Sequence, residues 1–169
     1  MNKELKSIIN KLNGNVLGIG LDDDLISVIE KNEKITECNL LDSIVKSRFG
    51  KGHGKSIRIK KIRTTFKRKK VDYIICNYET ISKYLDTFVK DSVYINKSKL
   101  YFFGKVDIEL LKKRYSRYKT DISEKKYRDN YILVIDNSEA VNNFLKDTYY
   151  RLVDFKDKLI EIIGDILMN

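Results

Sequence analysis

The chain of 169 residues contains no proline, one histidine and two cysteines. A single histidine excludes a metal site built on paired histidines. Cys38 and Cys76 lie inside apolar runs and match no metal-binding or redox spacing, so we expect buried thiols and a cytoplasmic location. No apolar run approaches the roughly 18 residues of a membrane span, and the N-terminus shows no signal peptide, so we expect no membrane association.

The net charge of +10 is concentrated in two segments. Residues 46–70 contain 12 basic and no acidic residues, and residues 97–128 contain 11 basic and 4 acidic residues. Two basic blocks on an otherwise acidic chain are typical of a surface that binds a polyanion such as RNA. The alternative is a solvated, lysine-rich surface. In the first interpretation, phosphates are held by basic residues of the first segment: Lys51, Lys55, Arg63, Arg68 and Lys69.

Strand and helix patterns alternate along the chain and predict a single α/β domain over residues 1–169. The predicted strands are 15–19, 35–40, 56–62, 71–76, 99–103 and 131–135. The predicted helices are 1–11, 22–31, 41–48, 80–89, 108–118 and 139–167, with a glycine-rich loop at 49–55. The short joins between them indicate a doubly wound, mostly parallel sheet with helices on both faces.

A glycine turn, Gly18-Ile19-Gly20, ends the first predicted strand and is followed by Asp22, Asp23 and Asp24. Glycine lets the backbone turn sharply and lets a ligand approach closely. Three carboxylates at a helix N-terminus would repel the pyrophosphate of a dinucleotide, whereas a cationic ligand without phosphate is compatible with them. The alternative is that the aspartates only cap the helix and nothing binds there.

The segment Val71-Asp72-Tyr73-Ile74-Ile75-Cys76-Asn77-Tyr78 is a mostly apolar strand with an early aspartate and a polar end. With the glycine turn and the order of elements, it makes residues 13–105 resemble the core of the class I S-adenosylmethionine-dependent methyltransferases. The resemblance implies that Asn77 and Tyr78 orient the methyl acceptor. In many nucleic-acid methyltransferases an Asn or Asp at this place is followed by prolines, which this chain lacks.

The same resemblance implies S-adenosylmethionine as the cofactor, without a metal. Gly18, Gly20 and Asp22 would line the methyl-donor site, and Glu37 or Asn39 would contact the ribose. Besides the missing prolines, other features depart from the family pattern. Asp22 and Asp24 stand where the family has two further glycines. Gly18 stands where an acidic residue is usual, and the family usually ends in an antiparallel hairpin, whereas here we predict one strand followed by a helix.

The predicted helix 139–167 carries a heptad pattern of more than three repeats. Its members are Val141, Leu145, Thr148, Leu152, Phe155, Leu159, Ile162 and Ile166. Part of this apolar stripe is expected to cover the sheet. The remainder predicts either a homodimer or packing against Leu5, Ile8 and Ile9 of the first helix.

These observations lead to three hypotheses of function. The first is a methyltransferase-like protein that transfers a methyl group from S-adenosylmethionine to a polyanion, with RNA as the leading substrate. The second is a non-catalytic protein of the same fold that binds nucleic acid or a protein partner through its basic segments. The third is a plain dimerisation module without a small ligand.

Overall fold

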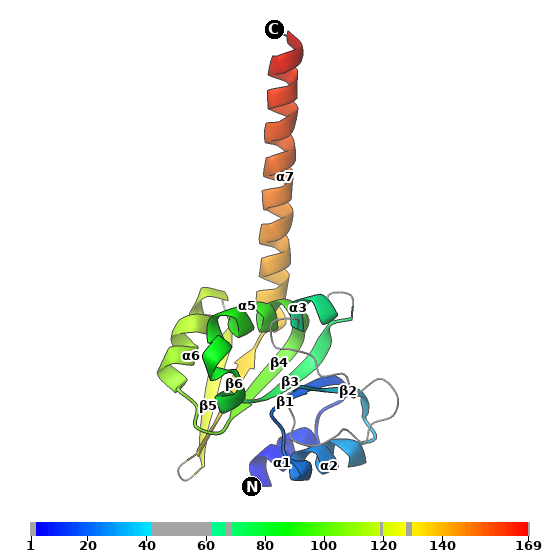
Figure 1. Cartoon of the computed structure of the whole chain (residues 1–169), viewed down its shortest axis with the longest axis vertical. Coiled ribbons are helices and arrows are strands. Elements are labelled where there is room, and N and C mark those ends of the chain that lie inside the picture. The colour runs from blue at the N-terminus through cyan, green and yellow to red at the C-terminus, as the bar shows by residue number, and fades with distance from the viewer. Residues whose placement is uncertain (1–2, 42–61, 67–68, 119, 128–129, 169) are drawn as a thin grey trace.

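Six strands form one sheet in the computed structural model, which describes residues 3–41, 62–66, 69–118, 120–127 and 130–168 (Figure 1). The strands are β1 (Gly14–Ile19), β2 (Ile35–Leu41), β3 (Val71–Asn77), β4 (Asn96–Phe103), β5 (Asp121–Tyr127) and β6 (Asn130–Asp136). Their order is β2-β1-β3-β4-β6-β5. The first four are parallel, and β6 runs antiparallel to both β4 and β5. The predicted doubly wound, mostly parallel sheet is therefore confirmed.

Helices cover both faces of the sheet. One face packs against α1 (Lys3–Ile9) and α2 (Asp23–Lys31). The other packs against α3 (Ile62–Thr65), α4 (Tyr78–Ile81), α5 (Leu85–Ile95) and α6 (Ile108–Tyr115), with 3-10 turns at η2 (Ser82–Tyr84) and η3 (Ser116–Tyr118). Successive residues of β3 show this division, because Ile74 and Cys76 join one apolar cluster and Ile75 joins the other.

Aspartate caps begin two of the covering helices. The Asp22 side chain accepts a hydrogen bond from the backbone N–H of Leu25, and the Asp107 side chain accepts one from Leu110, both at 3.0 Å. Each cap satisfies an N–H group that the first helical turn leaves without a partner.

The prediction of a single strand before the last helix was wrong, because β5 and β6 form an antiparallel hairpin. β5 is one of the two edge strands, and its described side chains are mostly exposed, including Glu124, Lys125 and Lys126. Charged residues on an edge strand discourage pairing with other chains, but they also hide the apolar alternation that reveals a strand. The chain therefore has the antiparallel hairpin that the sequence was expected to lack.

Several predicted boundaries also need correction. The predicted helix 80–89 begins at Tyr78 and continues through η2 and α5 to Ile95. Leu41, the first residue of the predicted helix 41–48, ends β2, and Ile62, the last residue of the predicted strand 56–62, begins α3. The remaining residues of those two predicted elements, and the loop 49–55, lie outside the described residues.

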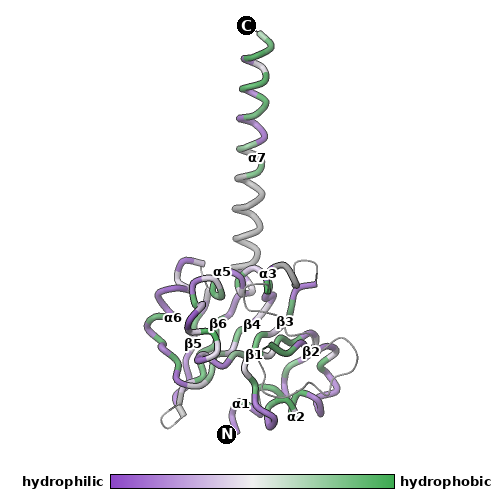
Figure 2. Tube along the Cα trace, viewed as in Figure 1, coloured by the Kyte–Doolittle hydropathy of each residue, from purple (hydrophilic) through white to green (hydrophobic). Residues whose placement is uncertain are grey.

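The last helix, α7 (Ser138–Met168), closely matches the predicted range. It contacts β4 and α5 and then projects away from the sheet (Figure 1). Figure 2 shows apolar and polar residues interspersed along its far end. Of the two alternatives for its apolar stripe, packing against Leu5, Ile8 and Ile9 of the first helix does not occur, because these residues pack in the cluster that includes α2.

Candidate functional site

Two glycines flank Asn77 at the carboxyl edge of the sheet, where the parallel strands end. Gly20 follows β1 and has a φ of +63°, and Gly104 follows β4 and has a φ of +94°. A Cβ atom added to Gly20 would lie 3.1 Å from the Asn77 Cβ, and one added to Gly104 would lie 3.1 Å from the Asn77 Oδ1. Ligands of open α/β sheets bind at this edge. The structure therefore brings Gly20 and Asn77 together, and adds Gly104, which the sequence analysis missed.

The glycine turn itself is held in place by its neighbours. The Gly20 N–H donates to the carbonyl oxygen of Leu41 at 2.9 Å, which joins the ends of β1 and β2. A Cβ on Gly20 would lie 2.1 Å from Thr80 Oγ1, so α4 approaches the turn closely. A Cβ on Gly18 would collide with the side chains of Leu21 and Leu40, at 2.5 and 2.9 Å. Core packing thus explains Gly18, while Gly20 lies at the edge.

Exposed carboxylates surround this edge. Asp22 caps α2, and Asp24 forms an ion pair with Lys6 at 3.3 Å. The Glu79 Oε2 atom is 3.6 Å from the Cβ position of Gly104, and Asp107 precedes α6. Negative side chains suit a ligand with positive charge and no phosphate. S-adenosylmethionine, with its sulfonium and ammonium groups, fits this set of residues in charge.

Asn77 and Tyr78 differ in their surroundings although they are adjacent. The Asn77 Oδ1 accepts a hydrogen bond from the Glu79 N–H at 3.1 Å and so caps α4. The Tyr78 ring is buried and contacts the Phe102 ring edge-on, with centroids 6.4 Å apart. Burial, and secondarily the nearby Asp107 carboxylate, raise the pKa of the Tyr78 hydroxyl. Asn77 is thus an edge residue, and the Tyr78 ring is part of the core.

The two residues predicted to contact a ribose lie before the end of β2. In the register of the sheet, Glu37 is opposite Asn15, and Asn39 is opposite Leu17. Glu37 precedes Leu41, the last residue of the strand, by four residues, which is about 13 Å of extended chain. Its carboxylate accepts a hydrogen bond from Asn39 at 3.2 Å and forms an ion pair with Lys69. The structure does not bring Glu37 to the glycine turn.

The sequence contains another acidic residue, Asp42, directly after the end of β2. β2 ends in Leu40 and Leu41, and Asp42 follows them directly in the sequence. An apolar pair followed by an aspartate is a normal end for a buried strand. The predicted strand 35–40 is one residue shorter than β2, so the residues predicted to contact the ribose, Glu37 and Asn39, lie inside the strand and before its end. Asp42 itself lies outside the described residues.

The described residues predicted to bind phosphate lie near the opposite, amino edge of the sheet. The Arg63 guanidinium and the Lys70 ammonium lie over the Tyr94 ring, 4.5 and 4.7 Å from its centroid. Burial and the neighbouring Lys97 lower the pKa of Lys70. β3 separates this cluster from Asn77 by about 20 Å. Lys51, Lys55 and Arg68 lie outside the described residues.

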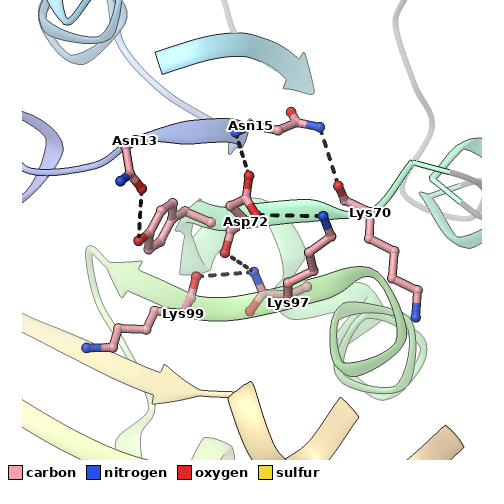
Figure 3. Close-up of polar contacts among 8 residues, drawn as sticks. Asn13, Asn15, Lys70, Asp72, Lys97 and Lys99 are labelled. Carbon is pink, nitrogen blue, oxygen red and sulfur yellow. Dashed lines mark hydrogen bonds and ion pairs between the residues drawn. The ribbon is translucent and has the colours of Figure 1, made fainter. Parts of the chain in front are cut away.

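A polar network joins the strands at this amino edge (Figure 3). The Asp72 carboxylate accepts a hydrogen bond from the Asn15 N–H at 2.8 Å, and the Asp72 carbonyl accepts one from Asn96 Nδ2 at 3.0 Å. Asn96 Oδ1 in turn accepts from Asn137 Nδ2 at 3.0 Å. Asn96 and Asn137 are fully buried. These contacts connect β1, β3, β4 and the end of β6.

Both cysteines are buried, as the sequence predicted. Burial, reinforced by Glu30 and Glu37, raises the pKa of the Cys38 thiol to about 12. Complete burial likewise raises the pKa of Cys76 well above its usual value. Such thiols stay protonated and are poor nucleophiles. The parts of the chain that the structure describes hold no group of three His, Cys, Asp or Glu suited to a metal, and no helix long and apolar enough to cross a membrane.

No protein-family pattern and no curated protein matches the sequence. Solved structures do match its fold. M. capricolum TrmK, in complex with S-adenosyl-homocysteine, has a TM-score of 0.55 and 16% identity over 80% of this chain and 67% of its own. An O-methyltransferase family protein from Burkholderia thailandensis has a TM-score of 0.59 and 8% identity over 79% of this chain and 55% of its own. A ribosomal protein L11 methylase from Lactobacillus delbrueckii subsp. bulgaricus has a TM-score of 0.54 and 12% identity over 79% of this chain and 76% of its own. The chain therefore has the Rossmann-like fold of the class I methyltransferases.

Proposed function

We propose that this protein binds S-adenosylmethionine at the carboxyl edge of its sheet and transfers the methyl group to a substrate. The observation that carries the proposal is the meeting of Gly20, Gly104 and Asn77 at that edge of a methyltransferase-like sheet. The crystallised TrmK holds S-adenosyl-homocysteine, which is the demethylated form of the same cofactor. The acidic surroundings support a cationic ligand over a phosphate-bearing one.

The residues of this edge have separate roles in the proposal. The Gly20 backbone and Asp22 hold the donor, and the Asn77 amide orients the acceptor. When bound, the cofactor supplies an electrophilic methyl group on a positively charged sulfur. The protein then contributes alignment, which is worth several kcal/mol by itself, so a strong general base is not required.

We further infer that the acidic residue for the ribose is Asp42 in place of Glu37 or Asn39. The support is the register, in which β2 continues to Leu41 and Glu37 pairs with Lys69 far from the turn. Asp42→Ala should weaken cofactor binding at least about tenfold, since a charge-assisted hydrogen bond contributes about 1.5–3 kcal/mol. Glu37→Ala is the matched control and should leave the affinity unchanged.

Two alanine substitutions in β1 and its turn test the donor site by isothermal titration with S-adenosylmethionine and S-adenosyl-homocysteine. Gly14 and Gly20 both have positive φ, and a Cβ on either would lie within 2.4 Å of a side-chain oxygen. Gly20→Ala disturbs the carboxyl edge, and Gly14→Ala causes comparable strain at the amino edge. We expect micromolar binding that only Gly20→Ala removes. Absence of binding by the unmodified protein at millimolar ligand would refute the proposal.

RNA is the substrate that we propose, on the basis of the two basic segments of the sequence. Among the solved structures of similar fold is Streptococcus pneumoniae Sp1610, proposed to be a tRNA methyltransferase, with a TM-score of 0.51 and 14% identity. Arg63, Lys69 and Lys70 would contact phosphates, and a strand of RNA spans the distance from them to Asn77 in a few nucleotides. Binding should then weaken steeply with added salt.

A second candidate function is RNA binding without methyl transfer. Two observations favour it. Thr80 lies close to the glycine turn and leaves less room for a cofactor there, and the basic cluster lies at the edge of the sheet opposite that turn. RNA affinity measured by fluorescence anisotropy, with and without S-adenosyl-homocysteine, distinguishes methyl transfer to RNA from RNA binding alone. Arg63→Gln with Lys69→Gln should reduce RNA affinity in both cases, whereas Lys31→Gln with Lys83→Gln is a control of equal charge change. RNA binding by a protein that fails to bind the cofactor would favour the second candidate.

A further inference from the structure

The far part of α7 exposes a continuous apolar surface. The described apolar side chains from Leu152 to Met168 have exposed fractions of 42% to 88%. The helix contacts the sheet at β4 and the helix α5, and its far end extends away from both (Figure 1). A contiguous apolar surface of this extent on a folded chain marks an interaction site. An isolated helix is also marginally stable in water without such packing.

The exposed side chains follow the period of a coiled coil. Five of them alternate at intervals of three and four residues, and we call them the α7 seam: Leu152, Phe155, Leu159, Ile162 and Ile166. An average interval of 3.5 residues is the period at which two supercoiled helices keep one face in contact. Ile160, Ile163 and Leu167 widen the seam to roughly 160° of the helix circumference, at 100° per residue.

The opposite side of the helix is acidic. Asp157, Glu161 and Asp165 are exposed there, together with Lys158. Helices that lie on membranes carry lysine and arginine on the polar side, because anionic lipids attract them. The acidic side of α7 therefore favours a protein partner over a lipid surface. Lys156 lies within the widened surface, between the directions of Ile163 and Leu167, where its alkyl stem can extend along apolar neighbours.

We propose that α7 packs against α7 of a second copy of this chain through the α7 seam. A partner helix must have the same 3.5-residue period, and a second copy has it by identity. The five seam residues and their three apolar neighbours expose roughly 100 Å² each, or on the order of 800 Å² per chain, which is what each partner buries in an interface of standard size. The two copies would use the same surface, as two-fold dimers do.

Sedimentation equilibrium of the full chain tests the pairing with two matched double variants. The seam variant, Leu159→Gln with Ile162→Gln, introduces two glutamines into the α7 seam. The control variant, Asp157→Gln with Glu161→Gln, introduces two glutamines on the acidic side of the helix. Glutamine is a good helix former, so helix propensity is retained in both. We expect at least twice the monomer mass for the unmodified chain and the acidic-side variant. The seam variant should dissociate at least about 100-fold more readily, because apolar surface is lost from both copies.

The cooperative thermal transition of each variant shows whether the sheet remains folded, which we expect because the substituted side chains are exposed. A monomeric unmodified chain at hundreds of micromolar would overturn the proposal. So would a seam variant with the mass of the unmodified protein. Flotation of the unmodified chain with phosphatidylcholine–phosphatidylserine vesicles, lost in the seam variant, would identify a lipid surface as the occupant and would also overturn it.

Discussion

At the amino edge of the sheet, side-chain amides and a carboxylate connect the strands, whereas at the carboxyl edge the same strands end in glycines and helix caps. Asp72 and Asn96 bond to neighbouring strands, and Asn96 is completely buried. At the other edge, Gly20 and Gly104 flank Asn77, whose side-chain oxygen caps its own helix. The comparison indicates that the hydrogen bonds that join neighbouring strands through side chains are concentrated at the amino edge, whereas the carboxyl edge carries the site proposed above for the cofactor.

The largest effect that this comparison predicts is at Asn96. Asn96→Leu keeps the size of the side chain but leaves the Asp72 carbonyl and the Asn137 amide without their partner. We expect the free energy of unfolding to fall by about 3 kcal/mol, because buried polar groups lose their hydrogen bonds. Urea denaturation measures the change. A loss below about 1 kcal/mol would contradict a stabilising role for the amino edge.

Alanine substitutions of Gly14 and Gly20 should lower stability by similar amounts but differ in their effect on cofactor binding. Gly14→Ala and Gly20→Ala each place a Cβ against an oxygen, of Asp72 and Thr80 respectively, at a positive φ. We expect each to cost about 2 kcal/mol in urea denaturation. Only Gly20→Ala should also remove cofactor binding by calorimetry. Equal loss of binding in both variants would show that the effect comes from lowered stability alone.

The pH dependence of stability should depend on Asp136, which ends β6 at the amino edge. Burial tends to raise the pKa of this carboxyl, but hydrogen bonds from the Ser138 hydroxyl and N–H, with help from Lys99, lower it overall. A lowered pKa in the folded state stabilises the protein above the unfolded pKa, near 4, and this contribution is lost as the pH falls through the folded pKa.

Ser138→Ala removes the hydroxyl hydrogen bond to Asp136, which measures 2.5 Å. We therefore expect lower stability than the unmodified protein near neutral pH and a smaller difference under acidic conditions. Urea midpoints at the two pH values measure this. A difference that stays constant with pH would mean that Ser138 acts without the charge of Asp136.

The smallest predicted change in stability is at Asn77, at the carboxyl edge. Asn77→Leu is the same substitution as the one proposed at Asn96, and it removes one cap from a helix of four residues. We expect a loss of about 0.5–1 kcal/mol. Methyl transfer to RNA, followed with radiolabelled cofactor, should nevertheless be abolished. A stability loss as large as that of Asn96→Leu would remove the distinction between the two edges.

Local patterns predicted the elements whose signal lies within a few neighbouring residues. The apolar run before Gly18 predicted β1, the aspartate cap predicted the start of α2, and the heptad spacing predicted α7 to within one residue at each end. β5 was missed because an exposed edge strand needs no apolar face. The correct end of β2 would have required Leu41, which directly precedes Asp42, to be counted as strand together with Leu40.

The sequence by itself determined an α/β fold, a glycine turn at the end of the first strand and a long amphipathic helix at the C-terminal end, because these depend on short-range periodicity and capping. Only the tertiary structure decided that Glu37 lies far from that turn, that Gly104 lies beside Asn77 and that Arg63 lies at the other edge. Those placements depend on strand order and register, and therefore on contacts between residues far apart in the chain.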